Sequence, residues 1–139
     1  MDLRTLTLTS LRVIPALLYI QHGVQKTFGL LGGFGQPGAT APLFSLMGLA
    51  GILESFGGLL FFLGLFTRPV ALVLFSEMMI AYGKAHAPQG FWPLLNHGEL
   101  ALLYGIIFLF FAAHGPGPMS LDAWWLARST SGRDSRPTT

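Results

Sequence analysis

The sequence predicts an all-α membrane protein, a bundle of four transmembrane helices followed by a short interfacial C-terminal helix. Three observations lead to this fold class. The chain of 139 residues is 52% hydrophobic and only 10% charged, whereas soluble proteins are roughly 25% charged. Its mean hydropathy is +0.59. Four apolar stretches approach the roughly 20 residues that a helix needs to cross a hydrocarbon core of about 30 Å.

The four predicted spans form one domain, residues 1–128. They cover residues 8–31, 44–66, 69–87 and 97–114. A connector rich in Gly and Pro, GGFGQPGATAP, separates the first two, whereas the four residues FTRP alone join the second to the third. Such a short link predicts an antiparallel hairpin, with Pro69 suited to the first turn of its second helix. No small-residue cleavage motif follows the first apolar stretch, so we expect a retained span rather than a signal peptide.

Aromatic residues mark two segments outside the spans. The third connector, HAPQGFWPLLN, carries Phe91 and Trp92, which favours an interfacial or re-entrant segment. After the last span, GPGPMSLDAWWLAR predicts a turn, an N-cap at Ser120 and a short helix over residues 120–128, with two tryptophans at the membrane interface. Residues 129–139 have the composition of a disordered tail.

The basic residues near the span ends are divided unevenly. Five lie on one side of the predicted bundle and two on the other: Arg4, Arg68, Arg128, Arg133 and Arg136 against Lys26 and Lys84. The positive-inside rule then places both termini in the cytoplasm and the two larger connectors outside. We therefore expect a multi-pass protein of the cell inner membrane, with the lipid bilayer as its first partner.

Composition also argues against several classes of function. The formal charge of +2 comes from scattered Lys and Arg rather than a basic patch with interleaved aromatics, so we expect no nucleic-acid partner. The absence of cysteine removes disulfides, CxxC redox pairs and thiolate metal sites. The four histidines form no HxxxH or ExxH pair, and we expect neither metal nor haem. Redox chemistry would need a carrier from outside the chain.

Polar residues inside the predicted spans are the candidates for function, because an ionisable group costs roughly 2.5–3.5 kcal/mol to insert. On the first helix, five residues fall in one stripe of roughly 100°: Arg12, Tyr19, His22, Gly23 and Lys26. Pro15 interrupts the backbone hydrogen bonds beside Arg12, and we expect the guanidinium to satisfy the freed carbonyls.

Two carboxyls extend this polar lining. Glu54 lies between Gly51 and Gly58 on one helical face, which predicts close approach of a neighbouring backbone. Folding the hairpin puts Glu54 and Glu77 at depths that differ by about 6 Å. We therefore expect neighbours, one of them protonated and able to exchange protons. The fourth helix adds polar groups only at its outer end, Asn96, His97 and Glu99, and beyond them its interior is expected to be wholly apolar.

The same charges allow a second interpretation, in which they only brace the bundle. Three acids balance three bases: Glu54, Glu77 and Glu99 against Arg12, Lys26 and Lys84. Bracing alone would account for them, because buried charges must be paired. For His22 the alternatives are a packing role, a proton relay, contact with a quinone oxygen or metal ligation. His86 and His114 fit interfacial positions.

Four motifs follow one another along the chain. They are Arg12 with HGVQK, GLAGILESFGGLLFFLGLFTRPVAL, Glu77 with NHGE, and GPGPMSLDAWW. From about residue 8 to 126 the chain thereby resembles the DoxX family of small four-span bacterial membrane proteins. The resemblance implies a redox-linked role, since some members are similar to the membrane subunit of thiosulfate:quinone oxidoreductase and others are tied to oxidative-stress or thiol-linked membrane complexes. It implies these functional polar positions: Arg12, His22, Lys26, Glu54, Arg68, Glu77, Asn96 and Glu99.

The resulting hypothesis is a redox membrane subunit, in one form a quinone-linked oxidoreductase subunit, that binds a quinone in a polar pocket of the outer half of the bilayer. The expected catalytic, proton-exchanging groups are Glu54, Glu77 and His22. The expected quinone-binding groups are Arg12, His22, Lys26, Asn96 and Glu99. A partner redox subunit or a homo-oligomer belongs to this hypothesis. Two alternatives remain, a non-enzymatic scaffold or assembly factor for a partner protein and a small transporter, and Arg12 as sole inner-half polar candidate counts against transport.

Overall fold

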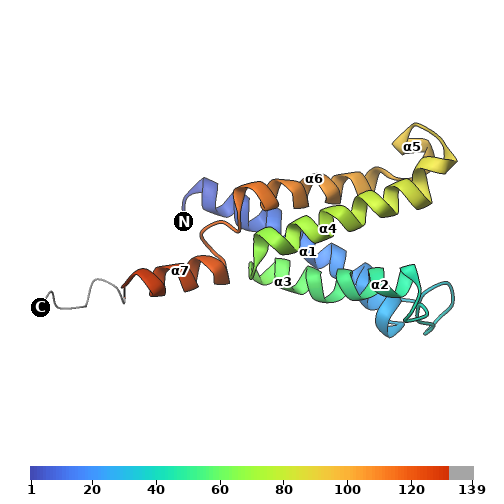
Figure 1. Cartoon of the computed structure of the whole chain (residues 1–139), viewed down its shortest axis with the longest axis horizontal. Helices are drawn as coiled ribbons and strands as arrows, with labels where there is room; N and C mark the ends of the chain where they lie inside the picture. The colour runs from blue at the N-terminus through green and yellow to red at the C-terminus, as the bar shows by residue number, and fades with distance from the viewer. Residues whose placement is uncertain (132–139) are drawn as a thin grey trace, which may run out of the picture.

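The computed structural model describes residues 1–131, and every element of secondary structure in that part of the chain is helical (Figure 1). The prediction of an all-helical protein is therefore confirmed. Most of the predicted disordered tail, residues 132–139, lies outside the described residues.

The first helix, α1, spans Leu3–Phe28. It begins after Asp2, whose carboxylate accepts a hydrogen bond from the Thr5 backbone N–H at 2.8 Å, and it ends at Gly29 in the left-handed conformation. The helix thus starts five residues before the predicted span and ends three residues before its predicted limit. Pro15 lies inside it.

The second predicted span is one continuous helical stretch, Leu46–Leu63. It consists of α2 (Leu46–Ile52), a π-helical turn η1 (Leu53–Gly57) and α3 (Gly58–Leu63). Gly64 ends the stretch in the left-handed conformation, and Phe66, also at positive φ, precedes the next helix. The link to α4 is therefore three residues long, as a hairpin of antiparallel helices requires.

The third and fourth predicted spans are built from several pieces. The helix α4 (Thr67–Ala81) continues into a second π-helical turn, η2 (Tyr82–His86), and a short 3-10 turn, η3 (Ala87–Gln89). The connector then forms one helical turn, α5 (Pro93–Asn96), before α6 (Glu99–His114).

The helices pack in two adjoining layers. One contains α1 against the α2–η1–α3 stretch, and the other contains α4 against α6 (Figure 1). Between the layers, four rings stack edge to face in the core: Tyr19, Phe61, Phe108 and Phe111. This aromatic core fills the bundle from its middle towards the end that carries the α3–α4 link.

A final helix, α7 (Leu121–Ser131), projects away from the bundle (Figure 1). Ser120 is its N-cap, as predicted, with its hydroxyl accepting the Ala123 N–H at 3.1 Å. The neighbouring Asp122 carboxylate accepts the backbone N–H groups of Phe66 and Thr67 at 2.8 and 2.9 Å, and so caps α4 across the chain. The helix reaches three residues past the predicted end at 128.

The expectation that Arg12 serves carbonyls freed by Pro15 is wrong. The Arg12 guanidinium instead donates to the Phe62 carbonyl at 3.4 Å and to the carbonyls of Pro116 and Met119. All three belong to segments far from α1 in sequence, because the side chain crosses to the place where the end of α3 meets the α6–α7 connection. Arg12 is 3% exposed, so its hydrogen bonds tie these segments together in the interior.

Two stretches of the described chain have the length and apolar composition of a membrane span, α1 and Leu46–Leu63, while α6 is apolar but shorter. Large apolar side chains remain exposed along the outer surface of the bundle: Ile14, Leu17, Leu18, Leu49, Phe56, Leu72, Leu103 and Ile106. A soluble monomer rarely exposes so much contiguous apolar surface. The bundle is thus covered by side chains suited to lipid rather than water.

Candidate functional site

A seam of glycines brings α1 into close contact with the second helical stretch. A Cβ atom on Gly51 would lie 2.7 Å from the Thr27 hydroxyl and 2.9 Å from the Lys26 Cβ, and one on Gly58 would lie 2.8 Å from Ile20 Cγ1. A methyl on Gly23 of α1 would overlap Ser55. Only glycine fits at these distances, and the predicted close backbone approach beside Glu54 is confirmed.

This contact sets Lys26 directly against Glu54. The Lys26 ammonium lies 2.5 Å from Glu54 Oε1, and the Glu54 side chain is only 5% exposed. The pair is the one ion pair within residues 1–131. Glu54 belongs to the π-helical turn η1, and such turns are often found at functional sites. Its second oxygen, Oε2, is buried with no hydrogen-bond partner among the described residues.

Glu77 forms a polar cluster with Lys26, Glu54 and Tyr19, but its own hydrogen-bond partner is neutral. The Tyr19 hydroxyl donates to Glu77 Oε2 at 2.7 Å, and Tyr19 itself is almost fully buried. Lys26 and Glu54 are both close enough to Glu77 to interact with its charge. Glu77 Oε1, like the free oxygen of Glu54, is buried without a partner in the described chain. Each carboxyl therefore keeps one oxygen available to a ligand or a proton.

A pocket of about 270 Å³ opens beside this cluster. Its polar lining comes from α1, η1, η2, the link between α5 and α6, and the first turns of α6. Its apolar wall comes from Met78, Ala81, Leu100 and Ala101. The polar lining residues are Tyr19, His22, Lys26, Glu54, His86, His97 and Tyr104. The pocket thus combines one ion pair, three imidazoles and two phenols at the end of the bundle opposite the α3–α4 link.

His22 is exposed and makes no hydrogen bond within the described residues. Its ring meets the edge of Tyr104 at 6.4 Å between centroids. A histidine with only a packing role would be buried and hydrogen-bonded. The geometry therefore favours a His22 side chain that faces the pocket. His86 is more constrained, because its Nδ1 lies 2.9 Å from the Asn96 carbonyl oxygen.

Four residues expected at the site lie outside this pocket. Glu77 lies next to it but lines a separate pocket of about 380 Å³ between the second helical stretch and α4. Arg12 is fourteen residues from Lys26 on α1, about 21 Å along the helix axis, and its donors are used by carbonyls. Asn96 is fully buried and folds the connector: its side-chain amide donates to Gly90 O at 2.7 Å and accepts from the Gly98 N–H at 2.9 Å. Glu99 is exposed in the first turn of α6. None of them lines the pocket.

Sequence reasoning missed Tyr104, and the expectation that the interior of the fourth helix is wholly apolar is wrong. Tyr104 lies one and a half turns into α6, is 5% exposed and packs edge to face on Tyr19 at 5.1 Å. Its isolation within an apolar helix was the signal available in the sequence. The three-to-three bracing arrangement is also incomplete, because Lys84 and Glu99 are exposed and Glu77 bonds a tyrosine.

The DoxX family model matches residues 7–87, more than half of the chain. The chain belongs to the DoxX family. An uncharacterized protein of Haemophilus influenzae is 41% identical over 83% of the chain and 87% of its own length. An uncharacterized membrane protein of Mycobacterium tuberculosis is 31% identical over 87% of the chain and 82% of its own length. No solved structure is significantly similar to the chain.

The DoxX match contains the ion pair and both buried carboxyls of the cluster, together with Tyr19 and His22. The remaining pocket residues, His97 and Tyr104 among them, come from beyond residue 87, where the relatives continue to align. Family membership, the relative described as a membrane protein and the apolar helices together make this DoxX protein a helical membrane protein.

Proposed function

We propose that this DoxX protein is a four-span subunit of a membrane redox system that binds a quinone head group in the pocket beside Lys26 and Glu54. The observation that carries the proposal is the polar pocket itself, which is lined by the Lys26–Glu54 pair and by Glu54 Oε2, a buried oxygen without a hydrogen-bond partner among the described residues. Glu77 Oε1 is likewise unpartnered, and Glu77 lines a neighbouring pocket. Polar atoms at membrane depth are costly without partners. A ligand that supplies those partners would remove that cost.

The four-span arrangement rests on helix lengths. Beyond the two long helical stretches, α4 and η2 together form twenty consecutive helical residues, about 30 Å at helical rise. The sixteen residues of α6 reach about 24 Å, and the polar start of α6 would lie at the membrane surface. Each piece is long enough to cross or nearly cross the hydrocarbon core.

The pocket suits a single polar ring. Its volume of about 270 Å³ is near the lower limit of roughly 300 Å³ for small-molecule sites. Lys26, His22 and the Tyr104 hydroxyl are positioned to donate to carbonyl oxygens, and the free oxygen of Glu54 can accept from a hydroxyl. A quinone would supply the electron-transfer chemistry that a chain without cysteine lacks.

The chain's own groups would then hold and move protons. Lys26 fixes Glu54 by one oxygen, which leaves Oε2 to take up or release a proton. Tyr19 fixes Glu77 in the same way and leaves Oε1. His22, exposed at the pocket, is placed between this floor and the surroundings of the bundle. We assign Glu54 and Glu77 to proton exchange, and His22 with Lys26 to binding of the ring.

Two other functions make different demands on the bundle. A transport path needs polar groups from end to end, but buried aromatics fill the half that contains Phe61, Phe108 and Phe111, and Arg12 there is held by three carbonyls. A scaffold or assembly factor needs no ligand in the pocket. The quinone and scaffold hypotheses therefore differ in one measurable property, ligand binding.

The test is thermal unfolding of the purified protein in detergent, with increasing concentrations of a short-chain quinone. A ligand that binds only the folded state raises the midpoint with its concentration. In His22→Gln we expect an unchanged midpoint without quinone, because His22 makes no hydrogen bond to lose, and a rise that needs about tenfold more quinone. His114→Gln is the matched control, since His114 lies at the opposite end of the bundle.

Each outcome selects one hypothesis. If the wild-type midpoint does not move at any quinone concentration, the quinone proposal fails and the scaffold remains. If His22→Gln lowers the midpoint equally with and without quinone, His22 is a structural residue rather than part of a binding site.

A further inference from the structure

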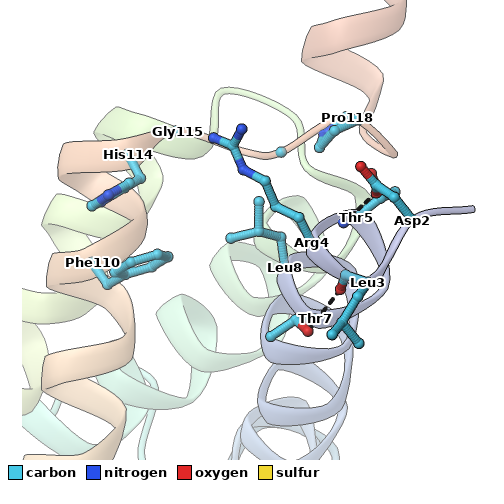
Figure 2. A pocket seen from close by; sticks show the side chains of 11 residues that line it. Asp2, Leu3, Arg4, Thr5, Thr7, Leu8, Phe110, His114, Gly115 and Pro118 are labelled. Carbon is cyan, nitrogen blue, oxygen red and sulfur yellow. Dashed lines mark hydrogen bonds between the residues drawn. The ribbon is translucent and has the colours of Figure 1, made fainter.

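A second cavity, of about 680 Å³, lies at the other end of the bundle, between the first turn of α1 and the end of α6 (Figure 2). Its wall includes the glycine-containing segment that leads from α6 towards α7. Because α1 crosses from this end into the bundle, the cavity belongs to the level of the membrane surface. It shares no residue with the pocket beside Lys26.

Arg4 is the cation of this cavity. Its side chain extends along the cavity towards Gly115, and the guanidinium makes no hydrogen bond or ion pair within residues 1–131 (Figure 2). Arg12, about two turns further along the same helix, donates from each of its three guanidinium nitrogens to a carbonyl. Arg4 therefore keeps five donors for a ligand, in the planar arrangement that suits a phosphate.

Asp2 supplies the opposite charge at the same rim. One oxygen of its carboxylate accepts the Thr5 N–H at 2.8 Å, and hydrogen bonds from the side chain and backbone of Thr5 hold the pKa of Asp2 below its usual range. The carboxylate is thus ionised at neutral pH. Its charge is also felt by Arg4, so the two lining charges cancel and the cavity is zwitterionic rather than basic.

The inner wall of the cavity is apolar. Leu8 and Phe110 form it, on the side that faces the bundle (Figure 2). The Thr7 hydroxyl donates to the Leu3 carbonyl at 2.8 Å, so this polar group is satisfied within α1. The cavity therefore has a charged rim and an apolar interior. This distribution of polarity matches that of a lipid at a membrane surface.

We propose that this cavity binds a phospholipid whose head group joins a phosphate to a primary amine, as in phosphatidylethanolamine. Arg4 would hold the phosphate, Asp2 would accept from the ammonium, and Leu8 with Phe110 would contact the first part of an acyl chain. A purely anionic head group would face the Asp2 carboxylate without compensation. A choline head group carries no N–H to donate to it.

The experiment compares three lipids with identical short acyl chains, carrying ethanolamine, choline or glycerol head groups, added to the purified full chain in detergent. The thermal midpoint is followed against lipid concentration. We expect the ethanolamine lipid to raise the midpoint at lower concentration than the other two. Arg4→Gln should weaken its apparent affinity about tenfold. Asp2→Asn should remove the preference over choline while keeping the N-cap, since asparagine caps as well as aspartate.

Two control variants remove the same charges elsewhere. Arg128→Gln and Glu99→Gln act at exposed positions away from the cavity, and both should bind the ethanolamine lipid like wild type. Retention of the lipid in native mass spectra provides a second measurement if a variant is less stable.

Three results would overturn the proposal. Equal responses to ethanolamine and choline lipids would show that the amine is not recognised, and a stronger response to the glycerol lipid would show an anion site. An equal response to free phosphoethanolamine would replace the lipid by a soluble ligand. None of these results depends on whether quinone binds the other pocket.

Discussion

At the scale of single residues, the buried cations of α1 have different partners and different roles. Arg12 spreads its planar guanidinium over the carbonyls of Phe62, Pro116 and Met119. A lysine offers a compact ammonium without that fixed fork, so arginine is the residue that can join the end of α3 to the α6–α7 connection. Lys26 meets one carboxylate oxygen at the edge of a pocket. We therefore assign Arg12 to the fold and Lys26 to the site.

The Lys26–Glu54 pair leads to a stability prediction. Glu54→Leu should lower the free energy of unfolding by on the order of 3–5 kcal/mol, because it leaves the Lys26 ammonium without its partner in a low-dielectric interior. Glu54→Gln should cost less, since the amide oxygen still accepts from Lys26. Denaturation in detergent, followed for both variants and wild type, measures the difference.

Glu99 is the control for this pair of substitutions. It is exposed and forms no ion pair with another described residue, so Glu99→Leu and Glu99→Gln should both stay within about 0.5 kcal/mol of wild type. Equal losses of stability in the two Glu54 variants would contradict a buried, partnered carboxyl.

The sequence was sufficient to predict which faces of α1 and of the second helix are polar, but not every contact they make. Helical periodicity puts Lys26 and Glu54 on inward faces, and the flanking glycines bring those faces together. Periodicity says nothing about the reach of a long side chain, so the destination of Arg12 was predicted wrongly. It also gives no partner for Glu77, because the Tyr19 hydroxyl becomes its donor only through the relative rotation of α1 and α4.

At the scale of helices, the two π-helical turns lie beside the candidate site. Glu54 belongs to η1 and His86 to η2. Each such turn inserts an extra residue into the helical repeat, so residues on either side are rotated relative to a regular α-helix. A helical wheel drawn from the sequence therefore loses register at these positions. The predicted limits of the second span and the start of the third differ from those observed for another reason, because these helix ends are set by Ser45, Gly64 and Phe66 rather than by the ends of the apolar stretches.

The glycine seam between α1 and the second stretch leads to an element-scale prediction. Gly23→Ala should destabilise the protein by about 1–3 kcal/mol, because the added methyl overlaps Ser55 and must push the two helices apart. The same displacement would separate Lys26 from Glu54, so quinone-dependent stabilisation should weaken with it. Thermal melts with and without quinone measure both effects.

Gly83 provides the matched comparison. It lies in η2, and a Cβ at this position would meet nothing within 4 Å. Gly83→Ala should therefore be neutral or stabilise by up to about 1 kcal/mol, through the reduced freedom of the unfolded chain. A loss in Gly83→Ala as large as the loss in Gly23→Ala would show that the close contact between the helices is not the reason Gly23 is sensitive, since alanine is the better helix former.

At the scale of the whole molecule, the two ends of the bundle differ in chemistry. The end with connector 29–45 and α5 carries the carboxyl pocket, whereas the opposite end carries both Arg12 and the cavity of Arg4 and Asp2 (Figure 1). The aromatic core between them is closed. Within the described residues this core separates the two polar regions, so we expect the pocket beside Lys26 and the cavity of Arg4 to bind their ligands independently.

The arrangement of the helices also predicts the orientation of the protein. The N-terminus, the α3–α4 link and the start of α7 lie at one end of the bundle (Figure 1). The sequence places five of the seven terminal Lys and Arg residues on that side, and short segments rich in these residues stay in the cytoplasm. Both termini should therefore be cytoplasmic, and the pocket beside Lys26 should open towards the outer face.

Two reporter proteins, each placed at the same two positions of the chain, test this orientation. A phosphatase that is active only outside the cytoplasm should be inactive when fused after residue 139 and active when inserted in connector 29–45. A fluorescent protein that matures only inside should give the reverse pattern at the same two positions. Phosphatase activity after residue 139 would reverse the orientation, and would place the Arg4 cavity in the outer leaflet instead of the inner one. The four-span bundle has three spans between the two positions, so activity of the same reporter at both would mean an even number of spans between them and would contradict the bundle itself.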